Sequence, residues 1–260
     1  MTVTGERVTT PERGFNPTWQ RHVAAYRLAG TMLGPGNVLD LGCGVGHSYR
    51  LLEPRETVGV DLSAEALGGQ GRETVMADMR ALPFAAGSFA SVLSVHSLEH
   101  VPDAERALAE AARVLAGDGK AVFVTPNRLT FGRADEIIDP YHYVEYDPLQ
   151  LEAVCAPFFE EVRVGGIFGS ERYQALLDEQ RAKLDRLLAK DPLRLRRLAP
   201  RRMLQLLYDR RLTAERSHVD VRADAIAVED FSFARSGLDG CLDLVAECTS
   251  PRLAATKPAR

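Results

Sequence analysis

The sequence lacks any uninterrupted apolar run of about 18 residues, so no membrane-spanning helix is predicted. Residues 1–16 are polar and hold no apolar block of the kind found in a signal peptide. We therefore expect, by default, a cytoplasmic protein that does not span a membrane. Binding of a lipid-linked molecule remains compatible with this expectation.

Closely spaced cysteine pairs are also absent. Cys43, Cys155, Cys241 and Cys248 lie far apart, and no C-x-x-C pair occurs. This spacing indicates neither a zinc site nor a disulfide framework. We expect the four thiols to be reduced and mostly buried.

An excess of positive charge is missing as well. The chain has 32 Lys and Arg against 36 Asp and Glu, a formal net charge of -4. This balance argues against a protein that coats nucleic acid, and no nucleic-acid partner is expected. Cationic residues do dominate between residues 172 and 211, where a solvated amphipathic face is favoured over a surface for an anionic ligand.

Short apolar runs alternate with helical patterns between residues 37 and 155, which is typical of parallel strands joined by crossover helices. Their lengths suit central strands covered on both faces. The sequence therefore predicts an α/β fold with a doubly wound, mostly parallel sheet. The expected strands are 37–41, 57–61, 73–77, 89–95, 120–125, 159–164 and, as the last strand, 242–248.

Local signals predict two helices of this fold. Residues 103–115 carry one apolar helical stripe, and Gly117 and Gly119 are expected to end that helix. Asp147 and Gln150 form a capping-box pattern with a first-turn proline between them, which predicts the start of a second helix.

Three glycines, Gly42, Gly44 and Gly46, follow the first expected strand at alternate positions. Glycine there lets the backbone turn sharply and approach a ligand, and α/β sheets bind ligands beyond the carboxyl ends of their strands. Asp40 lies two residues before the first of these glycines. Its carboxylate would repel a pyrophosphate but attract the ammonium of an amino-acid ligand that carries a sulfonium, so electrostatics favours a cationic cofactor.

A dinucleotide-dependent dehydrogenase is the competing interpretation, but its glycine spacing is G-x-G-x-x-G rather than the G-x-G-x-G found here. Asp61 ends the second strand, where it can accept hydrogen bonds from both ribose hydroxyls of an adenosine in either enzyme class. After the third strand, Asp78 offers an acceptor for the adenine amino group, and Met79 offers an apolar side chain for the ring face.

These motifs together closely resemble the class I methyltransferases of the type 11 group, over about residues 38–164. The resemblance implies a seven-stranded doubly wound sheet with an antiparallel last strand. It also implies S-adenosylmethionine as the cofactor and S-adenosylhomocysteine as the product. The motifs that carry it are Asp40–Gly46, Val60-Asp61, Leu82–Phe84, Leu98–Val101 and Gly117–Gly119.

The predicted cofactor site includes neighbours of these motifs. Cys43 lies within the glycine turn, Leu62 follows Asp61, and Ser94 belongs to the fourth strand. Tyr26 lies on the helix before the first strand, a segment that caps the cofactor in the resembling enzymes. A plain core aromatic is the alternative for Tyr26.

Five regions are expected along the chain. They are an N-terminal segment with the cofactor-capping helix (1–36), the S-adenosylmethionine-binding core (37–170), a helical insertion before the last strand (171–225), the final strand region (226–249) and a disordered tail (250–260). The insertion is a candidate substrate or oligomer surface, and a homodimer is compatible with the sequence.

A second group of motifs resembles bacterial methyltransferases of polysaccharide and oligosaccharide biosynthesis. This similarity suggests a sugar O-methyltransferase, like the actinobacterial enzymes of methylglucose lipopolysaccharide, that acts on a glycan or glycolipid precursor. A quinone, a small metabolite or a protein remains open as the acceptor, as does a binding protein without catalysis. The motifs are Thr4–Arg7, Arg21-His22 with Tyr26, Thr125–Arg128, Pro140–His142, Asp230-Phe231 and Leu242–Ala246.

Methylation of a sugar hydroxyl needs a general base or a metal, because an alcohol is a poor nucleophile at neutral pH. Histidine titrates in the useful range, so His142 and His100 are the first predicted catalytic residues, with Glu145 and then His96 as further candidates. The alternative for each histidine is a packing or capping role.

No metal site is predicted from the sequence. Glu99 is either structural or a contributor to metal binding. Asp135, Glu136 and Asp139 form a carboxylate cluster, for which a solvated loop is favoured over a cation site.

Overall fold

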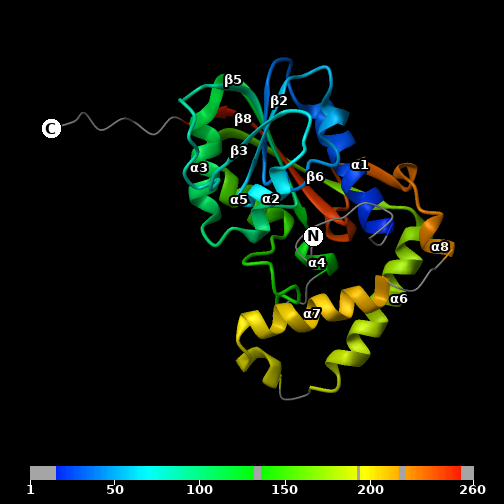
Figure 1. Cartoon of the computed structure of the whole chain (residues 1–260). Helices are drawn as coiled ribbons and strands as arrows, with labels where there is room; N and C mark the ends of the chain where they lie inside the picture. Colours follow the sequence, from blue (N-terminus) through cyan, green and yellow to red (C-terminus); the bar gives the residue numbers. More distant parts are fainter. Residues whose placement is uncertain (1–15, 132–135, 192–193, 217–220, 253–260) are drawn as a thin grey trace.

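A computed structural model describes residues 16–131, 136–191, 194–216 and 221–252 (Figure 1). Its described residues form one sheet of eight strands in the order β3-β2-β1-β4-β5-β8-β6-β7. Strands β1 to β5 pair in parallel, whereas β8 is antiparallel to both β5 and β6, and β7 is antiparallel to β6. The strands are β1 Val38–Leu41, β2 Thr57–Asp61, β3 Glu73–Met76, β4 Phe89–Val95, β5 Leu115–Pro126, β6 Phe159–Gly169, β7 Phe231–Ala234 and β8 Asp243–Pro251.

The predicted α/β class and the antiparallel last strand are confirmed, but the expected number of seven strands is wrong. The additional strand is β7, a four-residue edge strand that is too short to show a clear alternating pattern. The predicted helix end is also different, because Gly117 and Gly119 lie inside β5, and the helix before it stops at Val114.

Helices cover both faces of the sheet (Figure 1). Short helical turns lie among the connections, and they include η2 Leu98–His100 and η3 Leu195–Leu198. The predicted capping box is confirmed, since Asp147 accepts from the Gln150 amide and Gln150 accepts from the Asp147 amide. The helices are α1 Asn16–Met32, α2 Ala64–Leu67, α3 Ala104–Val114, α4 Arg128–Phe131, α5 Pro148–Cys155, α6 Glu171–Leu188, α7 Arg201–Arg216 and α8 Val221–Asp224.

Two hydrophobic clusters fill the space between the sheet and its helices. Leu39 of β1 points into the cluster shared with α3 and α5, whereas its neighbour Val38 points into the cluster shared with α1, α6 and α8. Successive side chains of a strand face opposite sides of a sheet, so one short apolar strand supplies both layers. The two clusters make a sheet buried on both faces, as the continuous apolar runs predicted.

The predicted helical insertion begins with α6. The first part of α6 packs on the core through Tyr173, Leu176 and Leu177, and the helix then extends away from the sheet (Figure 1). Within the described residues, no helix is both long enough and apolar enough to cross a membrane. Residues 1–15 and 253–260, which include Thr4–Arg7 and most of the predicted tail, lie outside the described part.

Candidate functional site

A pocket lies beyond the carboxyl ends of the first four strands. Its walls are residues that follow β1 (42–45), β2 (61–62), β3 (77–80) and β4 (96–97 and 100–102), with His22 and Tyr26 of α1. It encloses about 1060 Å³ of empty space when its open mouth is included. β1 pairs with β2 on one side and with β4 on the other, so the pocket lies at the switch point of the sheet, the usual ligand site of this fold class.

Gly42 and Gly44 of the glycine turn line this pocket, whereas the predicted cofactor residue Gly46 packs against the Gln70 side chain behind them. Gly42, Gly44 and Gly46 have φ angles of 67°, 53° and 66°, in the left-handed region that favours glycine. A Cβ at Gly42 would lie 2.3 Å from the Cβ of Ser97, so the turn also packs tightly against the segment after β4. A Cβ at Gly44 would meet nothing within 4 Å, because this glycine faces the open pocket.

Asp61 lies on the pocket wall with its carboxylate held by backbone amides. Oδ2 accepts a hydrogen bond from the Gly44 amide at 2.9 Å, and Oδ1 accepts one from the Ser63 amide at 2.8 Å. Each carboxylate oxygen can accept a further hydrogen bond. The carboxylate that is predicted to accept hydrogen bonds from the ribose therefore lies in the pocket, and the two amides fix its orientation.

We expect Asp61→Ala to weaken S-adenosylmethionine binding more than tenfold. That factor corresponds to the loss of about 1.5 kcal/mol of hydrogen bonding to the ribose. Calorimetric titration measures it, with Glu65→Gln as the control, because this exposed neighbour on α2 loses the same charge outside the pocket. Equal affinities of wild type and Asp61→Ala would remove the ribose role. Thermal unfolding must accompany the titration because the Gly44 and Ser63 amides also lose their acceptor.

The other predicted adenosine contacts lie on the same wall. Leu62, Asp78 and Met79 all line the pocket, and Cys43 lines it from the glycine turn. Asp78 is already paired, since Arg80 donates to its carboxylate through Nε and through Nη2 at 2.6 Å. Burial raises the pKa of the Cys43 thiol to about 12, so this thiol stays protonated at neutral pH.

Asp40 and Ser94 lie behind the pocket wall rather than on it. The Asp40 carboxylate is fully buried, accepts from the Tyr26 hydroxyl at 3.0 Å and pairs with Arg72 at 2.8 Å. Ser94 is buried and lies 2.5 Å from the Ser97 hydroxyl oxygen. Tyr26 itself lines the pocket, so it stands between Asp40 and the cofactor space.

The burial of Asp40 has an electrostatic consequence. Burial raises the pKa of its carboxyl group, although Arg72 and Tyr26 act in the opposite direction. The pairing with Arg72 neutralises much of the charge that the sequence argument used to attract an ammonium group. Direct binding of the cofactor by Asp40 stays a prediction. In the structure, Asp40 also holds the hydroxyl group of Tyr26 and so positions a side chain that lines the pocket.

Three histidines that come from separate segments line the pocket near α1. His22 stacks on His96 with ring centroids 4.3 Å apart, and His47 packs on Trp19 at 4.6 Å. His22 belongs to the helix that the sequence predicts to cap the cofactor, whereas no role is predicted for His47, because no local pattern links α1 to the segment after the glycine turn. Burial, together with the neighbouring histidines, lowers the pKa of His22 well below its usual value.

We expect the folded protein to lose stability in mild acid because His47 is buried in its neutral form. Burial, with a contribution from His96, lowers its pKa to about 4, against about 6.5 in an unfolded chain. The unfolded state binds more protons between these values, so the stability contributed by neutral His47 is complete above about pH 6.5 and is lost as the pH falls towards about 4. We expect His47→Gln to show a flatter decline of Tm over this range. An equally steep decline in wild type and variant would contradict the assignment.

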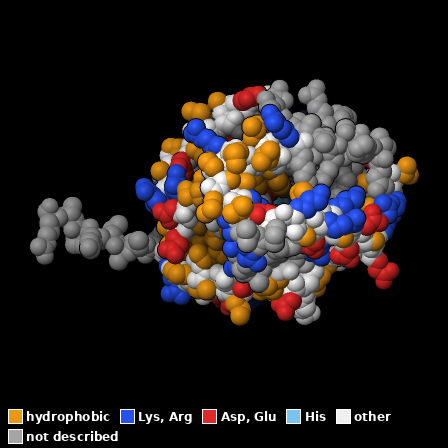
Figure 2. Space-filling view, turned by 90° about the horizontal axis from the view of Figure 1, so that it is seen from below, with side chains coloured by type: hydrophobic (Ala, Val, Ile, Leu, Met, Phe, Trp, Pro, Cys, Tyr) orange, Lys and Arg blue, Asp and Glu red, His pale blue; other side chains and the backbone are white. Residues whose placement is uncertain are grey.

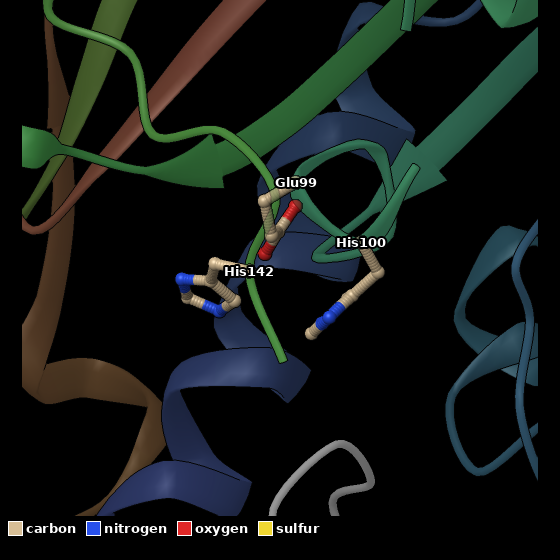
Figure 3. A group of neighbouring side chains, drawn as sticks. All are labelled: Glu99, His100 and His142. Carbon is tan, nitrogen blue, oxygen red and sulfur yellow. The ribbon is translucent and has the colours of Figure 1, made fainter. Parts of the chain in front are cut away.

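A second group of side chains borders the same pocket on the side of His100. One oxygen of Glu99 and one nitrogen each of His100 and His142 lie within 4.8 Å of one another (Figure 3). The rings of His100 and His142 are 5.0 Å apart, and the Glu145 carboxylate accepts from Nδ1 of His142 at 2.8 Å. His100 lines the pocket, whereas His142 and Glu145 lie behind it.

The charges around His142 shift its proton equilibrium. Burial by itself lowers the pKa of His142, but the hydrogen bond to Glu145 and the charges of Asp139 and Glu99 raise it above the usual value. Burial would raise the pKa of Glu99, yet the interactions with His96, His100 and His142 lower it to about 2. Glu99 is therefore a buried carboxylate that keeps its negative charge.

The insertion holds the loop that carries His142. Arg201 of α7 donates to the carbonyls of Pro140 at 2.7 Å and of His142 at 2.9 Å, and its guanidinium lies 3.6 Å from the centre of the Tyr143 ring. Tyr141 donates to Asp209 of α7 at 2.7 Å. These contacts give the insertion a positioning role that the sequence did not indicate.

The prediction that the carboxylate cluster lies in a solvated loop is wrong for Glu136 and Asp139, the two members that the structure describes. Glu136 pairs with Arg196 and Arg197 of η3, and Asp139 accepts a hydrogen bond from the Tyr208 hydroxyl at 2.9 Å. Their side chains are only 12% and 19% exposed, because the insertion covers this loop. Asp135 lies outside the described residues.

Sequence comparisons match the part of the chain that builds the cofactor pocket. A model of the methyltransferase domain family matches residues 39–123. A protein of Mycobacterium tuberculosis, named as a probable S-adenosylmethionine-dependent methyltransferase, is 32% identical over an alignment of 183 positions that covers 66% of this chain and 66% of the relative. The matched region is thus slightly less than two thirds of that relative's length. A ubiquinone/menaquinone biosynthesis C-methyltransferase of Desulfotalea psychrophila is 38% identical over 120 residues, which are 42% of this chain and 48% of that protein.

Solved structures share the whole fold. A methyltransferase of Thermotoga maritima aligns with a TM-score of 0.58 and 17% identity over 89% of this chain and 90% of its own. A phosphoethanolamine N-methyltransferase of Haemonchus contortus, in complex with S-adenosylhomocysteine, aligns with a TM-score of 0.56 and 17% identity over 90% of this chain and 53% of its own. The family match and the named relatives support the predicted enzyme class and cofactor. Residues 39–123 of this chain thus match the methyltransferase domain family, and the relatives named here are described as methyltransferases.

Proposed function

We propose that this protein transfers the methyl group of S-adenosylmethionine to a hydroxyl oxygen of a sugar in a glycan or glycolipid precursor. S-adenosylmethionine supplies an electrophilic methyl carbon on a sulfonium. The acceptor oxygen bonds to this carbon as the carbon–sulfur bond breaks, and the hydroxyl proton must leave. The chain therefore has to hold the hydroxyl in line and assist the loss of its proton.

The observation that carries this proposal is the group of His100, His142 and Glu145 at the border of the cofactor pocket. An imidazole lone pair can take the proton of a hydroxyl directly or can bind a metal that lowers the pKa of the hydroxyl. Methyl transfer to an amine lone pair needs less assistance than transfer to an alcohol. An oriented pair of histidines thus favours an oxygen acceptor.

The surface beside this group supports a large, amphipathic acceptor. The insertion exposes apolar side chains on η3 and α7, among them Leu198 at 83% and Leu207 at 53% exposed. Figure 2 shows hydrophobic side chains interspersed with Lys and Arg on the face seen from below. Such a surface suits a lipid-linked glycan better than a free sugar.

The test is transfer of a labelled methyl group from S-adenosylmethionine to a panel of glycans, glycolipids, quinones and small phenols. We expect label in the carbohydrate fraction, and acid hydrolysis should release an O-methyl sugar. Cofactor binding without any labelled acceptor would favour a binding protein that has lost catalysis. Absence of cofactor binding would overturn the methyltransferase assignment of the whole protein.

A quinone is the second candidate acceptor. The match to the ubiquinone/menaquinone C-methyltransferase favours it, but that match covers only 42% of this chain. Label in the quinone fraction alone would replace the sugar proposal.

A further inference from the structure

Glu99, His100 and His142 converge from two segments that are distant in the sequence. Glu99 and His100 belong to η2, directly after β4, and His142 belongs to the loop that α7 holds. Figure 3 shows the Glu99 carboxylate lying between the two imidazole rings. Their ligand atoms lie within 4.8 Å of one another, near enough for small side-chain rotations to bring all three onto one metal ion.

Both histidines have one ring nitrogen already engaged by an acceptor. Nδ1 of His100 donates to the Tyr141 carbonyl at 3.2 Å, and Nδ1 of His142 donates to the Glu145 carboxylate at 2.8 Å. A carbonyl or carboxylate oxygen only accepts, so in each neutral imidazole Nε2 carries the free lone pair. Histidines that bind a metal through one ring nitrogen usually donate a hydrogen bond from the other, as Nδ1 does here.

Glu99 is a buried carboxylate without a hydrogen bond to either oxygen. Its residue is 0% exposed, and the contact from Nδ1 of His96, at 3.5 Å, is an ion-pair contact rather than a hydrogen bond. Buried carboxyl oxygens without a partner cost free energy, and a bound cation would satisfy both of them. The unsatisfied oxygens are therefore an independent sign that a positive charge belongs between the three side chains.

The backbone fixes the two segments relative to each other. The Glu99 carbonyl accepts from the amide of Tyr143 at 2.7 Å, so the residue after His142 is bound to the residue before His100. Arg201 holds the other side of the same loop through the His142 carbonyl. The three ligand positions are thus set by main-chain contacts rather than by the side chains alone.

We propose that Glu99, His100 and His142 bind one divalent transition-metal ion. Two imidazoles and one carboxylate suit zinc, cobalt, nickel or iron(II) better than magnesium or calcium, which prefer oxygen ligands. Three protein ligands leave at least one coordination position open, and His100 places the ion at the pocket wall. An acceptor hydroxyl would occupy that position; this use of the site rests on the proposed function, whereas metal binding does not.

Titration of the full chain with Co²⁺ tests the site, because the visible absorption bands of bound cobalt report its ligands. The protein is first dialysed against a chelator. We expect one Co²⁺ per chain, with loss of the bands in Glu99→Gln and in His142→Ala. Glu145→Gln should retain the bands but bind about 10 to 100 times more weakly, because Glu145 orients a ligand without being one. Glu161→Gln, on the exposed part of β6, is the matched control and should bind like wild type.

Circular dichroism of each variant separates loss of the site from loss of the fold. The proposal is overturned if folded Glu99→Gln binds Co²⁺ like wild type, or if wild type shows no bands. Loss of the bands in His47→Gln with retention in Glu99→Gln would assign the ion to the pocket histidines and would also overturn it. Metal binding without methyl transfer to any glycan would leave the metal site standing and contradict only the proposed acceptor.

Discussion

Replacing Asp243 by leucine is expected to lower the free energy of unfolding by about 3 to 5 kcal/mol. Asp243 starts β8, and its carboxylate receives the Arg21 guanidinium of α1 through Nε at 2.8 Å and through Nη2. The Asp243 and Arg21 side chains are 0% and 10% exposed. The leucine variant leaves Arg21 charged in a buried place, which is costly against a total stability of about 5 to 15 kcal/mol.

The double variant Arg21→Met with Asp243→Leu distinguishes this explanation from simple loss of packing. A buried ion pair replaced on both sides by apolar residues is often neutral or stabilising, so the double variant should recover most of the lost stability. Urea unfolding of the wild type, both single variants and the double variant measures the coupling. A double variant as unstable as Asp243→Leu would show that the unpaired charge is not the cause.

This ion pair also explains why α1 covers the pocket. Arg21 lies just over one turn before Tyr26 on α1, and His22 between them lines the pocket. His96 is 3.4 Å from Asp243 through Nε2, so the same carboxylate faces the segment after β4. This contact of Arg21 is invisible in the local sequence, because its partner lies 222 residues away.

The residues that follow strands could be predicted because the carboxyl ends of parallel strands meet at one edge of a sheet. Gly44, Asp61, Met79 and His100 belong to four separate segments, yet each lies at or shortly after the end of a predicted strand, and all line one pocket. Their positions therefore followed from the periodicity of the strands and from chain order. Their contacts with the cofactor stay predictions.

The partners of buried charges could not be predicted from local pattern. The position of Asp40 shortly before the glycine turn predicts a cofactor ligand, but in the structure its carboxylate pairs with Arg72 and accepts a hydrogen bond from Tyr26. Arg72 lies in a short connection before β3, where nothing in the sequence distinguishes it from a surface arginine. Burial and pairing depend on the packed sheet, so a correct strand assignment did not reveal them.

The contacts of the helical insertion could not be predicted from the local sequence either. Its helical character was predictable from leucine spacing, but its contacts were not. Arg201 and Asp209 of α7 hold the loop of His142, and Arg196 near η3 holds Glu136. The cationic residues that were interpreted as a solvated face thus include ones that build the border of the site.

Replacing His142 by alanine is expected to lower the turnover of methyl transfer by about 10² to 10⁴ fold while the affinity for S-adenosylmethionine stays nearly unchanged. The lost imidazole assists removal of the hydroxyl proton, either directly or as a ligand of the bound ion. His142 lies behind the pocket wall and contacts His100 and Glu145, so its removal leaves the cofactor contacts in place. Single-turnover transfer of labelled methyl and calorimetric titration measure the two quantities separately.

Glu145→Gln is the informative comparison for this variant. The introduced amide would still accept a hydrogen bond from Nδ1 of His142 but would carry no charge, so we expect a smaller loss of turnover together with a shifted pH profile. Unchanged turnover in His142→Ala would exclude His142 from catalysis. A parallel loss of cofactor affinity would instead indicate that the loop supports the pocket. A fall in turnover alone would mean that the two parts of the site have separate tasks. The residues at the strand ends would bind the cofactor, and the loop of His142 would act on the acceptor.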